Sequence, residues 1–304
     1  MPVETVDRLA VVLEAEAVRV SAEVDDFFAR LLPSTGDSRD RLYEAMRHAA
    51  IGGGKRLRPL LTIAAAKLFA IPPERALRVG CAIEALHVYS LIHDDLPCMD
   101  DADLRRGKPT VHKAYGEAEA VLAGDSLHAL AFEILAHEAT DSDPWVRSDL
   151  VLELARAAGP GGMAGGQMMD LVAEGHQLDL PSITRLQQLK TGALIEYAVD
   201  APCIMVHLSH DARTPYRGYA RNIGLAFQIA DDLIDHSGDE KAAGKRTGKD
   251  ANAGKATFVS VLGPERARQQ ASFLVTQAIE HLADHGEEAD LLRAIARFAI
   301  ERDH

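Results

Sequence analysis

The sequence predicts an all-α fold, and three observations carry this prediction. Apolar residues recur at three- and four-residue spacing along most segments, beginning with Val6, Leu9 and Leu13, as they do on the buried face of a helix. No run of alternating Val, Ile, Thr and aromatic residues is bounded by hairpin turns, and aromatic residues make up only 5% of the chain, which argues against a β-sandwich. The stretch 76–93 is apolar almost all round and predicts a helix buried inside a bundle. Because no linker rich in Pro, Gly or Ser divides the chain, we expect residues 1–304 to form one all-helical domain.

The expected helices follow one another along the whole chain. The first helix, over 4–32, ends at the break Pro33-Ser34-Thr35-Gly36-Asp37, whose residue types favour a turn. A short helix over 39–50 ends at Gly52-Gly53-Gly54, because three consecutive glycines are too flexible for a helix interior. The same periodicity predicts the later helices at about 58–70, 74–94, 115–139, 145–158, 182–200, 215–235 and 265–302.

Charge and composition exclude several functional classes. The chain has 33 Lys and Arg against 46 Asp and Glu, a formal net charge of −13, which disfavours nucleic acid and anionic lipid as partners. A polyanionic ligand would need a local basic pocket or metal ions. No apolar run is long enough to predict a membrane span, and the start Met1-Pro2-Val3-Glu4 lacks the pattern of a signal peptide. Three scattered cysteines, Cys81, Cys98 and Cys203, suit neither a disulfide framework nor a zinc site, so we expect a cytoplasmic protein.

Two aspartate clusters each follow an apolar helix. The first is His93-Asp94-Asp95-Leu96-Pro97-Cys98-Met99-Asp100-Asp101-Ala102-Asp103, and the second is Asp231-Asp232-Leu233-Ile234-Asp235. Asp231 and Asp235 are four residues apart, so their carboxylates share one face of a helix and repel each other. An uncompensated cluster beside buried residues is costly, so a cation is expected among them. Basic side chains are one alternative, but hard divalent cations match clustered carboxylate oxygens better.

Basic residues gather beside glycines in several loops. Phosphate oxygens suit Arg forks and Lys point charges at such loops. The run Gly52-Gly53-Gly54-Lys55 is not a P-loop, because the preceding strand and the following Ser or Thr are missing. Each loop alone is weak evidence, but together with the aspartates they imply a diphosphate ligand bridged by Mg²⁺. The basic loops are Gly52-Gly53-Gly54-Lys55-Arg56-Leu57-Arg58-Pro59, Arg105-Arg106-Gly107-Lys108, Lys190-Thr191-Gly192, Lys245-Arg246 and Gly254-Lys255-Ala256-Thr257.

These motifs, in this order, resemble those of the trans-prenyltransferases, the short-chain polyprenyl diphosphate synthases. The spacings Asp94-Asp95-x-x-x-x-Asp100 and Asp231-Asp232-x-x-Asp235 are similar to that family's two aspartate-rich motifs, and the resemblance covers roughly residues 45–260. Two extra residues at Pro97-Cys98 resemble the longer first motif of the bacterial farnesyl diphosphate synthases. The resemblance implies an isoprenoid-synthase-like bundle of antiparallel helices around a deep central cavity, a homodimer, and three Mg²⁺ ions per active site.

The resemblance also implies a role for each matching residue. The substrates would be isopentenyl diphosphate and an allylic diphosphate, dimethylallyl or geranyl, joined head to tail by ionisation, condensation and elimination. The implied Mg²⁺ site consists of Asp94, Asp95, Asp100, Asp231, Asp232 and Asp235. Isopentenyl diphosphate would be held by Lys55, Arg58, His87 and Arg106. The allylic diphosphate and its carbocation would face Arg105, Lys190, Thr191, Gln228, Lys245 and Lys255, with Lys245 reaching the diphosphate when the site closes.

Product length is expected to depend on the helix that precedes Asp94. Ser90 and Tyr89 lie four and five residues earlier, roughly 6–8 Å along a helix. In the resembling family an aromatic residue here accompanies the C15 product, so Tyr89 is the expected floor of the cavity. Geranylgeranyl and geranyl diphosphate stay open as products. The mixed C-terminus, Glu301-Arg302-Asp303-His304, departs from the family's basic tail and puts closure by the terminus in doubt.

Three other functional classes were weighed against the synthase. A noncatalytic partner subunit of such a synthase is disfavoured by the intact aspartates. A terpene cyclase would leave Lys55, Arg58 and Arg106 without a purpose. The pair His93-Asp94 is also found in HD-type phosphohydrolases, but the remaining histidines form no matching ligand set.

Overall fold

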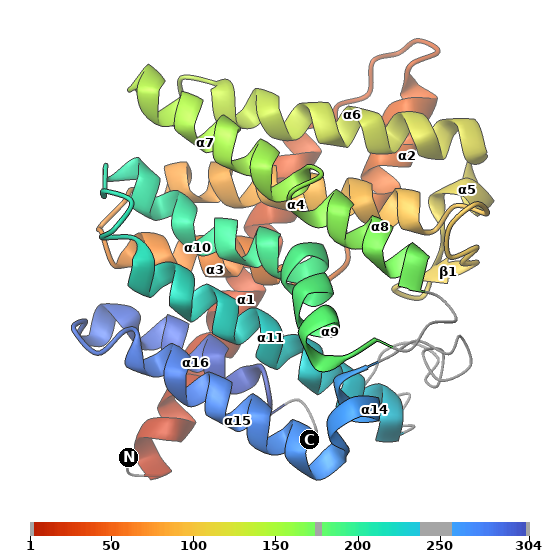
Figure 1. Ribbon diagram of the computed structural model, residues 1–304. Coiled ribbons are helices and arrows are strands. Elements are labelled where there is room, and N and C mark those ends of the chain that lie inside the picture. Colours follow the sequence, from red (N-terminus) through yellow and green to blue (C-terminus); the bar gives the residue numbers. More distant parts are fainter. Residues whose placement is uncertain (1–2, 174–177, 238–256, 302–304) are drawn as a thin grey trace. The chain divides into compact units, whose positions relative to one another are not determined.

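The computed structural model describes residues 3–173, 178–237 and 257–301, and it confirms the all-α prediction (Figure 1). Within these residues the only strands are Leu104–Arg105 (β1) and Lys108–Pro109 (β2), which pair antiparallel. Strands of two residues are too short to leave an alternating pattern in the sequence. By their internal contacts the residues form two compact units. We name them the α4 unit (residues 14–63 and 71–151) and the α11 unit (residues 1–13, 64–70 and 152–304).

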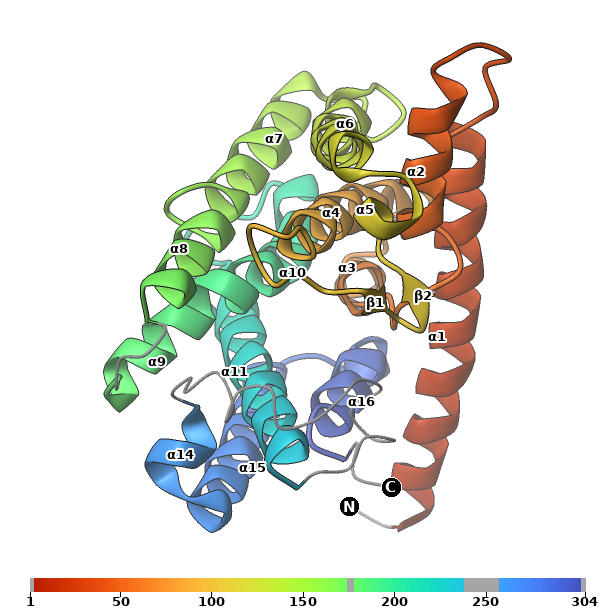
Figure 2. The same ribbon diagram turned by 90° about the vertical axis from the view of Figure 1, so that its right-hand side faces the viewer.

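The α4 unit is built around the predicted buried helix. This helix, α4 (Pro73–Asp94), packs along α6 (Glu117–Ala136), and α2 (Asp40–Ala50) packs against both, as Figure 2 shows. Every residue from Val79 to Leu86 is buried, so the prediction of a helix that is apolar all round is confirmed. The unit also contains α5 (Val111–Ala114), most of α1 (Val3–Leu31) and α3 (Leu57–Lys67), and the start of α7 (Pro144–Ala158).

The α11 unit is centred on the helix that carries the second aspartate cluster. This helix, α11 (Thr214–Ser237), packs against α15 (Pro264–Glu280) and α10 (Ala193–Met205). In α10 every residue from Tyr197 to Met205 is buried. The other elements are α8 (Met163–Ala173), α9 (Leu180–Gln187), the π-helical segment η1 (Gln188–Gly192), α14 (Phe258–Leu262), the 3₁₀ segment η2 (Glu287–Ala289) and α16 (Asp290–Phe298).

The prediction of one helix over 265–302 is wrong. The chain forms two helices there, α15 and α16, because the turn between them ends the first. The Arg293 guanidinium donates hydrogen bonds to the carbonyls of Leu282, His285 and Gly286 at 2.6–3.0 Å. Those carbonyls thereby find partners outside a continuous helix, which is how helix ends are satisfied. No periodicity in the sequence reveals such a side-chain cap.

One further helix was not predicted, and two others have different bounds from those expected. Helix α8 was not predicted, because Gly165-Gly166 lowers its helix propensity. The helix expected over 182–200 starts at Leu180, passes through η1 and continues to Met205. The helix expected over 115–139 is shorter, since Gly116, with φ 116°, separates α5 from α6.

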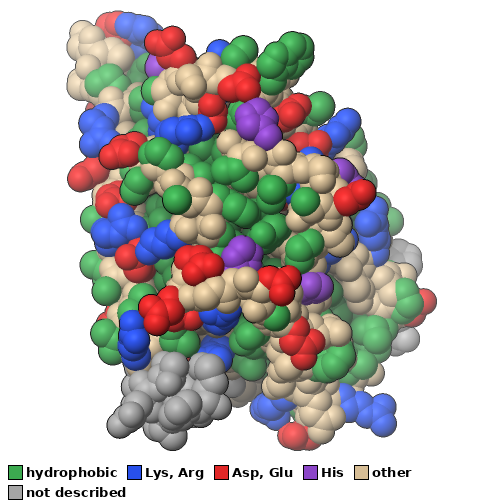
Figure 3. Space-filling model, turned by 90° about the vertical axis from the view of Figure 1, so that its left-hand side faces the viewer, with side chains coloured by type: hydrophobic (Ala, Val, Ile, Leu, Met, Phe, Trp, Pro, Cys, Tyr) green, Lys and Arg blue, Asp and Glu red, His purple; other side chains and the backbone are tan. Residues whose placement is uncertain are grey.

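Among the described helices none is both long and apolar enough to cross a bilayer. On the face drawn in Figure 3, Lys and Arg side chains are interspersed with Asp and Glu side chains.

Candidate active site

The first aspartate cluster forms the end of α4 and the loop that folds back on it. The Asp100 amide donates to the Asp94 carbonyl at 2.8 Å, and the Ala102 amide donates to the Asp95 carbonyl at 3.2 Å. Asp94 is half-buried and Asp100 is exposed, whereas Asp95 is only 3% exposed. The carboxylate of Asp95 accepts Arg105 Nε at 2.7–2.8 Å and Arg105 Nη2 at 2.6 Å. Asp95 therefore holds Arg105 from a buried position, whereas Asp94 and Asp100 are more exposed.

A two-residue hairpin turn separates Arg105 from Arg106. Arg106 and Gly107 both have positive φ, 52° and 75°, between β1 and β2, the conformation that favours glycine in tight hairpins. Arg105 turns toward Asp95, while Arg106 Nη1 donates to the carbonyl of Gly53 at 3.0 Å. A Cβ at Gly54 would lie 2.5 Å from the Arg106 guanidinium carbon. Glycine at position 54 thus leaves the space that Arg106 occupies over the loop.

Cations gather around His87 beside this glycine loop. Desolvation lowers the pKa of the His87 imidazole well below its ordinary value, and the nearby charges of Arg58 and Arg106 lower it further. Burial likewise lowers the pKa of the Arg58 and Arg106 guanidinium groups. The Arg58 Nε is buried without a hydrogen-bond partner, a costly state in a folded protein. Such a cluster of partly desolvated cations is stabilised by an anion.

The second aspartate cluster repeats the pattern of the first. Asp231 is exposed and Asp235 is half-buried, whereas Asp232 is 6% exposed. One Asp232 oxygen accepts Gln228 Nε2 and the other accepts the Phe258 amide, both at 2.9 Å. In both clusters the second aspartate is therefore buried and hydrogen-bonded, while the first and last are more exposed.

The π-helical segment η1 carries Lys190 and Thr191. It packs against α8 and α11, and a Cβ at Gly166 of α8 would lie 2.2 Å from the Lys190 amide nitrogen. Lys190 Nζ lies 2.6 Å from an oxygen of Asp170 on the same helix α8. Short π segments within helices are frequent at functional sites. Asp170 was missed by the sequence analysis, because a lone aspartate after Gln167-Met168-Met169 carries no signal until the fold brings Lys190 to it.

Tyr89 and Ser90 point to different neighbours. The Tyr89 ring makes edge contacts with His93 at 5.6 Å and with His128 of α6 at 4.9 Å between centroids. His128 in turn contacts Phe132 at 5.2 Å. Ser90 Oγ donates to the His87 carbonyl at 2.8 Å. Tyr89 is thus part of an aromatic row between α4 and α6. Of the other predicted residues, Lys55 is exposed, and Lys245 and Lys255 lie outside the described residues.

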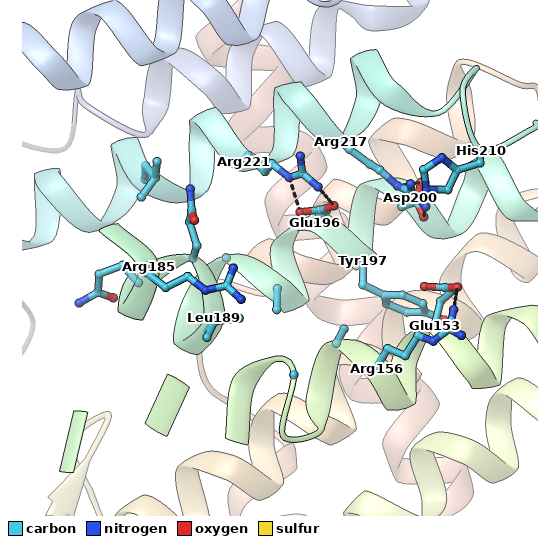
Figure 4. A pocket seen from close by; sticks show the side chains of 17 residues that line it. Glu153, Arg156, Arg185, Leu189, Glu196, Tyr197, Asp200, His210, Arg217 and Arg221 are labelled. Atoms are coloured by element: carbon cyan, nitrogen blue, oxygen red, sulfur yellow. Dashed lines mark hydrogen bonds and ion pairs between the residues drawn. The ribbon is translucent and has the colours of Figure 1, made fainter. Parts of the chain in front are cut away.

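A separate cavity lies in the α11 unit. It measures about 590 Å³ and lies among α7, α9, η1, α10 and α11 (Figure 4). None of the predicted site residues that the structure describes is among its lining residues. Its charges are largely paired internally: Arg221 binds Glu196 at 2.7–2.8 Å, and Arg217 binds Asp200 at 3.0 Å. These pairs leave the cavity little net charge with which to attract a ligand.

Comparison with known proteins decides the family. The family model described as polyprenyl synthetase matches residues 39–297. The chain belongs to the polyprenyl synthetase family. It is 43% identical to the farnesyl diphosphate synthase of Escherichia coli over 268 residues, which is 86% of this chain and 89% of that protein. It is 45% identical to geranylgeranyl pyrophosphate synthase 11 of Arabidopsis thaliana over 79% of this chain and 69% of that protein.

A solved structure of this family is more similar still. The crystal structure of an FPP/GFPP synthase from Zymomonas mobilis is 57% identical, with a TM-score of 0.89, and the match covers 95% of this chain and 99% of that one. The resemblance inferred from the aspartate motifs and the isoprenoid-synthase fold are therefore both confirmed.

Proposed function

We propose that this chain is a farnesyl diphosphate synthase, which joins isopentenyl diphosphate head to tail to dimethylallyl or geranyl diphosphate. Its family membership and its farnesyl and geranylgeranyl synthase relatives support this reaction. The observation that carries the proposal is the cation cluster of Arg58 and Arg106, which surrounds the neutral imidazole of His87 beside the glycine loop. The cluster lies in the same unit as the carboxylates of Asp94 and Asp100. A diphosphate matches both, since cations bind its oxygens directly and carboxylates bind it through divalent ions.

The residues fit Mg²⁺ as the cofactor. Hard carboxylate oxygens at water-accessible helix ends are suitable ligands. Mg²⁺ commonly binds through one or two carboxylates and takes its remaining ligands from substrate phosphates and water. We propose three ions per active site, held by Asp94, Asp100, Asp231 and Asp235. Bound Mg²⁺ supplies positive charge that stabilises the departing diphosphate.

The chain's own residues bind, orient and shield the reactants. Lys55, Arg58 and Arg106 hold isopentenyl diphosphate, and Arg105 and Lys190 contact the allylic diphosphate. The allylic C–O bond breaks with its electron pair on the diphosphate, and the alkene of isopentenyl diphosphate attacks the resulting allylic cation. The leaving diphosphate then takes the proton whose loss completes the new double bond. Preorganised dipoles stabilise developing charge at no reorganisation cost, and we assign this role to Thr191, Gln228 and the carbonyls of η1. Lys245 and Lys255 keep their implied roles at the allylic diphosphate.

Several broader properties accompany this proposal. One family model spans residues 39–297, which supports a single domain over 1–304. We propose the homodimer from the family resemblance, and the large apolar side chains exposed on the α4 unit, Val121, Leu122 and the 77% exposed Trp145, are candidates for its interface. Light scattering of the purified protein tests it. All three cysteines are unpaired, which supports the cytoplasmic location.

A product assay tests the function. Purified protein is given Mg²⁺, isopentenyl diphosphate and either allylic starter, and chain length is read by mass. We expect a C15 product that disappears with chelator. A C20 or C25 product would keep the family and change the product, because the Arabidopsis relative is a geranylgeranyl pyrophosphate synthase and the Zymomonas relative an FPP/GFPP synthase. No condensation with either starter would favour the partner-subunit alternative.

Replacing Tyr89 with Ala is expected to move the main product from C15 to C20 or longer. The ring fills space between α4 and α6 beside His128, and its removal opens a cavity along α4. Mass analysis of the products measures the shift, with Ser90→Ala as the matched control that keeps C15. If Tyr89→Ala still stopped at C15, Tyr89 would not be the floor.

A further inference from the structure

Arg56 differs from the other two cations that follow the glycine loop. It is 2% exposed, whereas Lys55 is exposed and Arg58 is half-buried. Its Nη1 donates to Glu84 of α4 at 2.8 Å, and its Nη2 donates to Asp25 of α1 at 2.6 Å. Nη2 also donates to the carbonyl of Ala50 at the end of α2, at 2.6 Å. One guanidinium therefore ties the loop to three helices.

The charge of Arg56 is already neutralised within the protein. Burial alone would lower the pKa of its guanidinium, but the charges of Glu84 and Asp25 outweigh burial and hold that pKa above the usual value. Burial lowers the pKa of Arg58 and Arg106, and the charge of Glu84 opposes this only in part. A buried pair fixed by charge-assisted hydrogen bonds is rigid, so Arg56 is held in place. The positive charges of Arg58 and Arg106 are less fully compensated by the protein and can bind a diphosphate.

The backbone shows what this anchoring achieves. Arg56 has a φ of 46°, a left-handed conformation that non-glycine residues rarely adopt unless the surroundings enforce it. Asp25 also accepts the Gly52 amide at 3.1 Å, so one carboxylate fixes both ends of the segment from 52 to 56. Lys55 precedes Arg56 directly, and Arg58 follows two residues later. Their directions depend on the turn that Arg56 makes.

We propose that Glu84 and Asp25, acting through Arg56, position the glycine loop for isopentenyl diphosphate, and that Arg56 is a positioning residue and not a ligand. This inference rests on the proposed function, in which Lys55, Arg58 and Arg106 bind that substrate. Glu84 lies one helical turn before His87 on α4. The same helix thus carries the anchor of the loop and a residue of the site.

The test compares the two substrates in Glu84→Gln. We expect KM for isopentenyl diphosphate to rise about tenfold, the loss of roughly one charge-assisted hydrogen bond to the diphosphate. KM for the allylic substrate and kcat should each change less than about threefold. The residues that contact the allylic diphosphate, Arg105 and Lys190, are not positioned by the glycine loop. Asp200→Asn is the matched control: Asp200 is 4% exposed and pairs with Arg213 and Arg217 on the α11 unit. It should lower the melting temperature and leave both KM values unchanged.

A double variant separates positioning from stability. Arg56→Gln with Glu84→Gln leaves neither charge of this pair buried alone, so the melting temperature should recover relative to Glu84→Gln. KM for isopentenyl diphosphate should stay raised, because a glutamine at position 56 has fewer donors than arginine and cannot reach the side chain at position 84, Asp25 and the Ala50 carbonyl together. If KM recovers with the melting temperature, or if Glu84→Gln raises both KM values equally, the positioning role is wrong.

Inorganic pyrophosphate distinguishes failure of this inference from failure of the proposed function. Calorimetric titration in EDTA measures binding to the cations alone, without divalent ions and without turnover. The wild type should bind pyrophosphate about tenfold more tightly than Glu84→Gln. Equal affinities would overturn the inference even in an active enzyme. A tenfold difference in a protein without condensation activity would retain the inference and reject the function.

Discussion

Replacing Asp94 with Asn is expected to lower kcat for condensation about a hundred- to thousandfold, the scale of losing one group that stabilises transition-state charge. Asn keeps the shape of the side chain but removes the negative charge that binds a divalent cation. Asp94 is the last residue of α4 and is half-buried, and the Asp100 amide of the following loop donates to its carbonyl. Initial rates at saturating substrates, repeated over a series of Mg²⁺ concentrations, measure the change. The half-saturating Mg²⁺ concentration should rise as kcat falls.

Two neighbours in the same cluster make the comparison specific. Asp103→Asn removes an equal charge from an exposed side chain that pairs with Lys113 at 3.0 Å, and kcat should stay within about twofold, since such pairs contribute little. Asp95→Asn should reduce activity while leaving the Mg²⁺ requirement unchanged, because Asp95 acts by holding Arg105. If Asp94→Asn kept more than a tenth of the activity, or if Asp95→Asn shifted the Mg²⁺ requirement equally, the division of roles within the cluster would be wrong.

The fold class was predictable because it leaves a strong local signal in the sequence, and the expected site residues rest on a local signal as well. A helix that is apolar all round is stable in water only when other helices surround it, and α4 is buried in this way. Repelling aspartates after such a helix, with arginines beside glycines, demand a ligand of opposite charge wherever the helices lie. The break between α15 and α16 had no such signal, because it depends on Arg293 reaching back to Leu282 and His285.

The sequence could not predict which of the clustered side chains hold other protein groups in place, because this depends on hydrogen-bond partners distant in sequence. Asp95 and Asp232 look like their neighbours in the sequence, yet their oxygens are taken by Arg105 and by Gln228 and the Phe258 amide. Arg56 likewise stands between two expected ligands and is buried against Glu84, 28 positions later. Spacing predicts which residues gather. Burial and hydrogen bonds decide which of them remain for a substrate.

Replacing Gly166 with Ala is expected to lower both stability and kcat. The new Cβ would lie 2.2 Å from the Lys190 amide nitrogen and 2.6 Å from its Cα, and backbone atoms cannot move aside as the end of a flexible side chain can. Overpacking of this kind costs roughly 1–3 kcal/mol or more. Ala has a higher helix propensity than Gly by about 1 kcal/mol, and this gain offsets only part of the cost of overpacking. Calorimetry measures the fall in melting temperature.

The loss of kcat should exceed what the loss of stability explains. Either α8 or η1 must shift, so the 2.6 Å contact between Lys190 and Asp170 is broken or displaced, and a misplacement of about 1 Å can cost a hundredfold in rate. Gly161→Ala is the matched control, because a Cβ there meets nothing within 4 Å. It should leave kcat unchanged at a temperature where both variants are folded. If Gly166→Ala loses stability but keeps kcat under those conditions, the close packing of α8 on η1 supports the fold and does not set the position of Lys190.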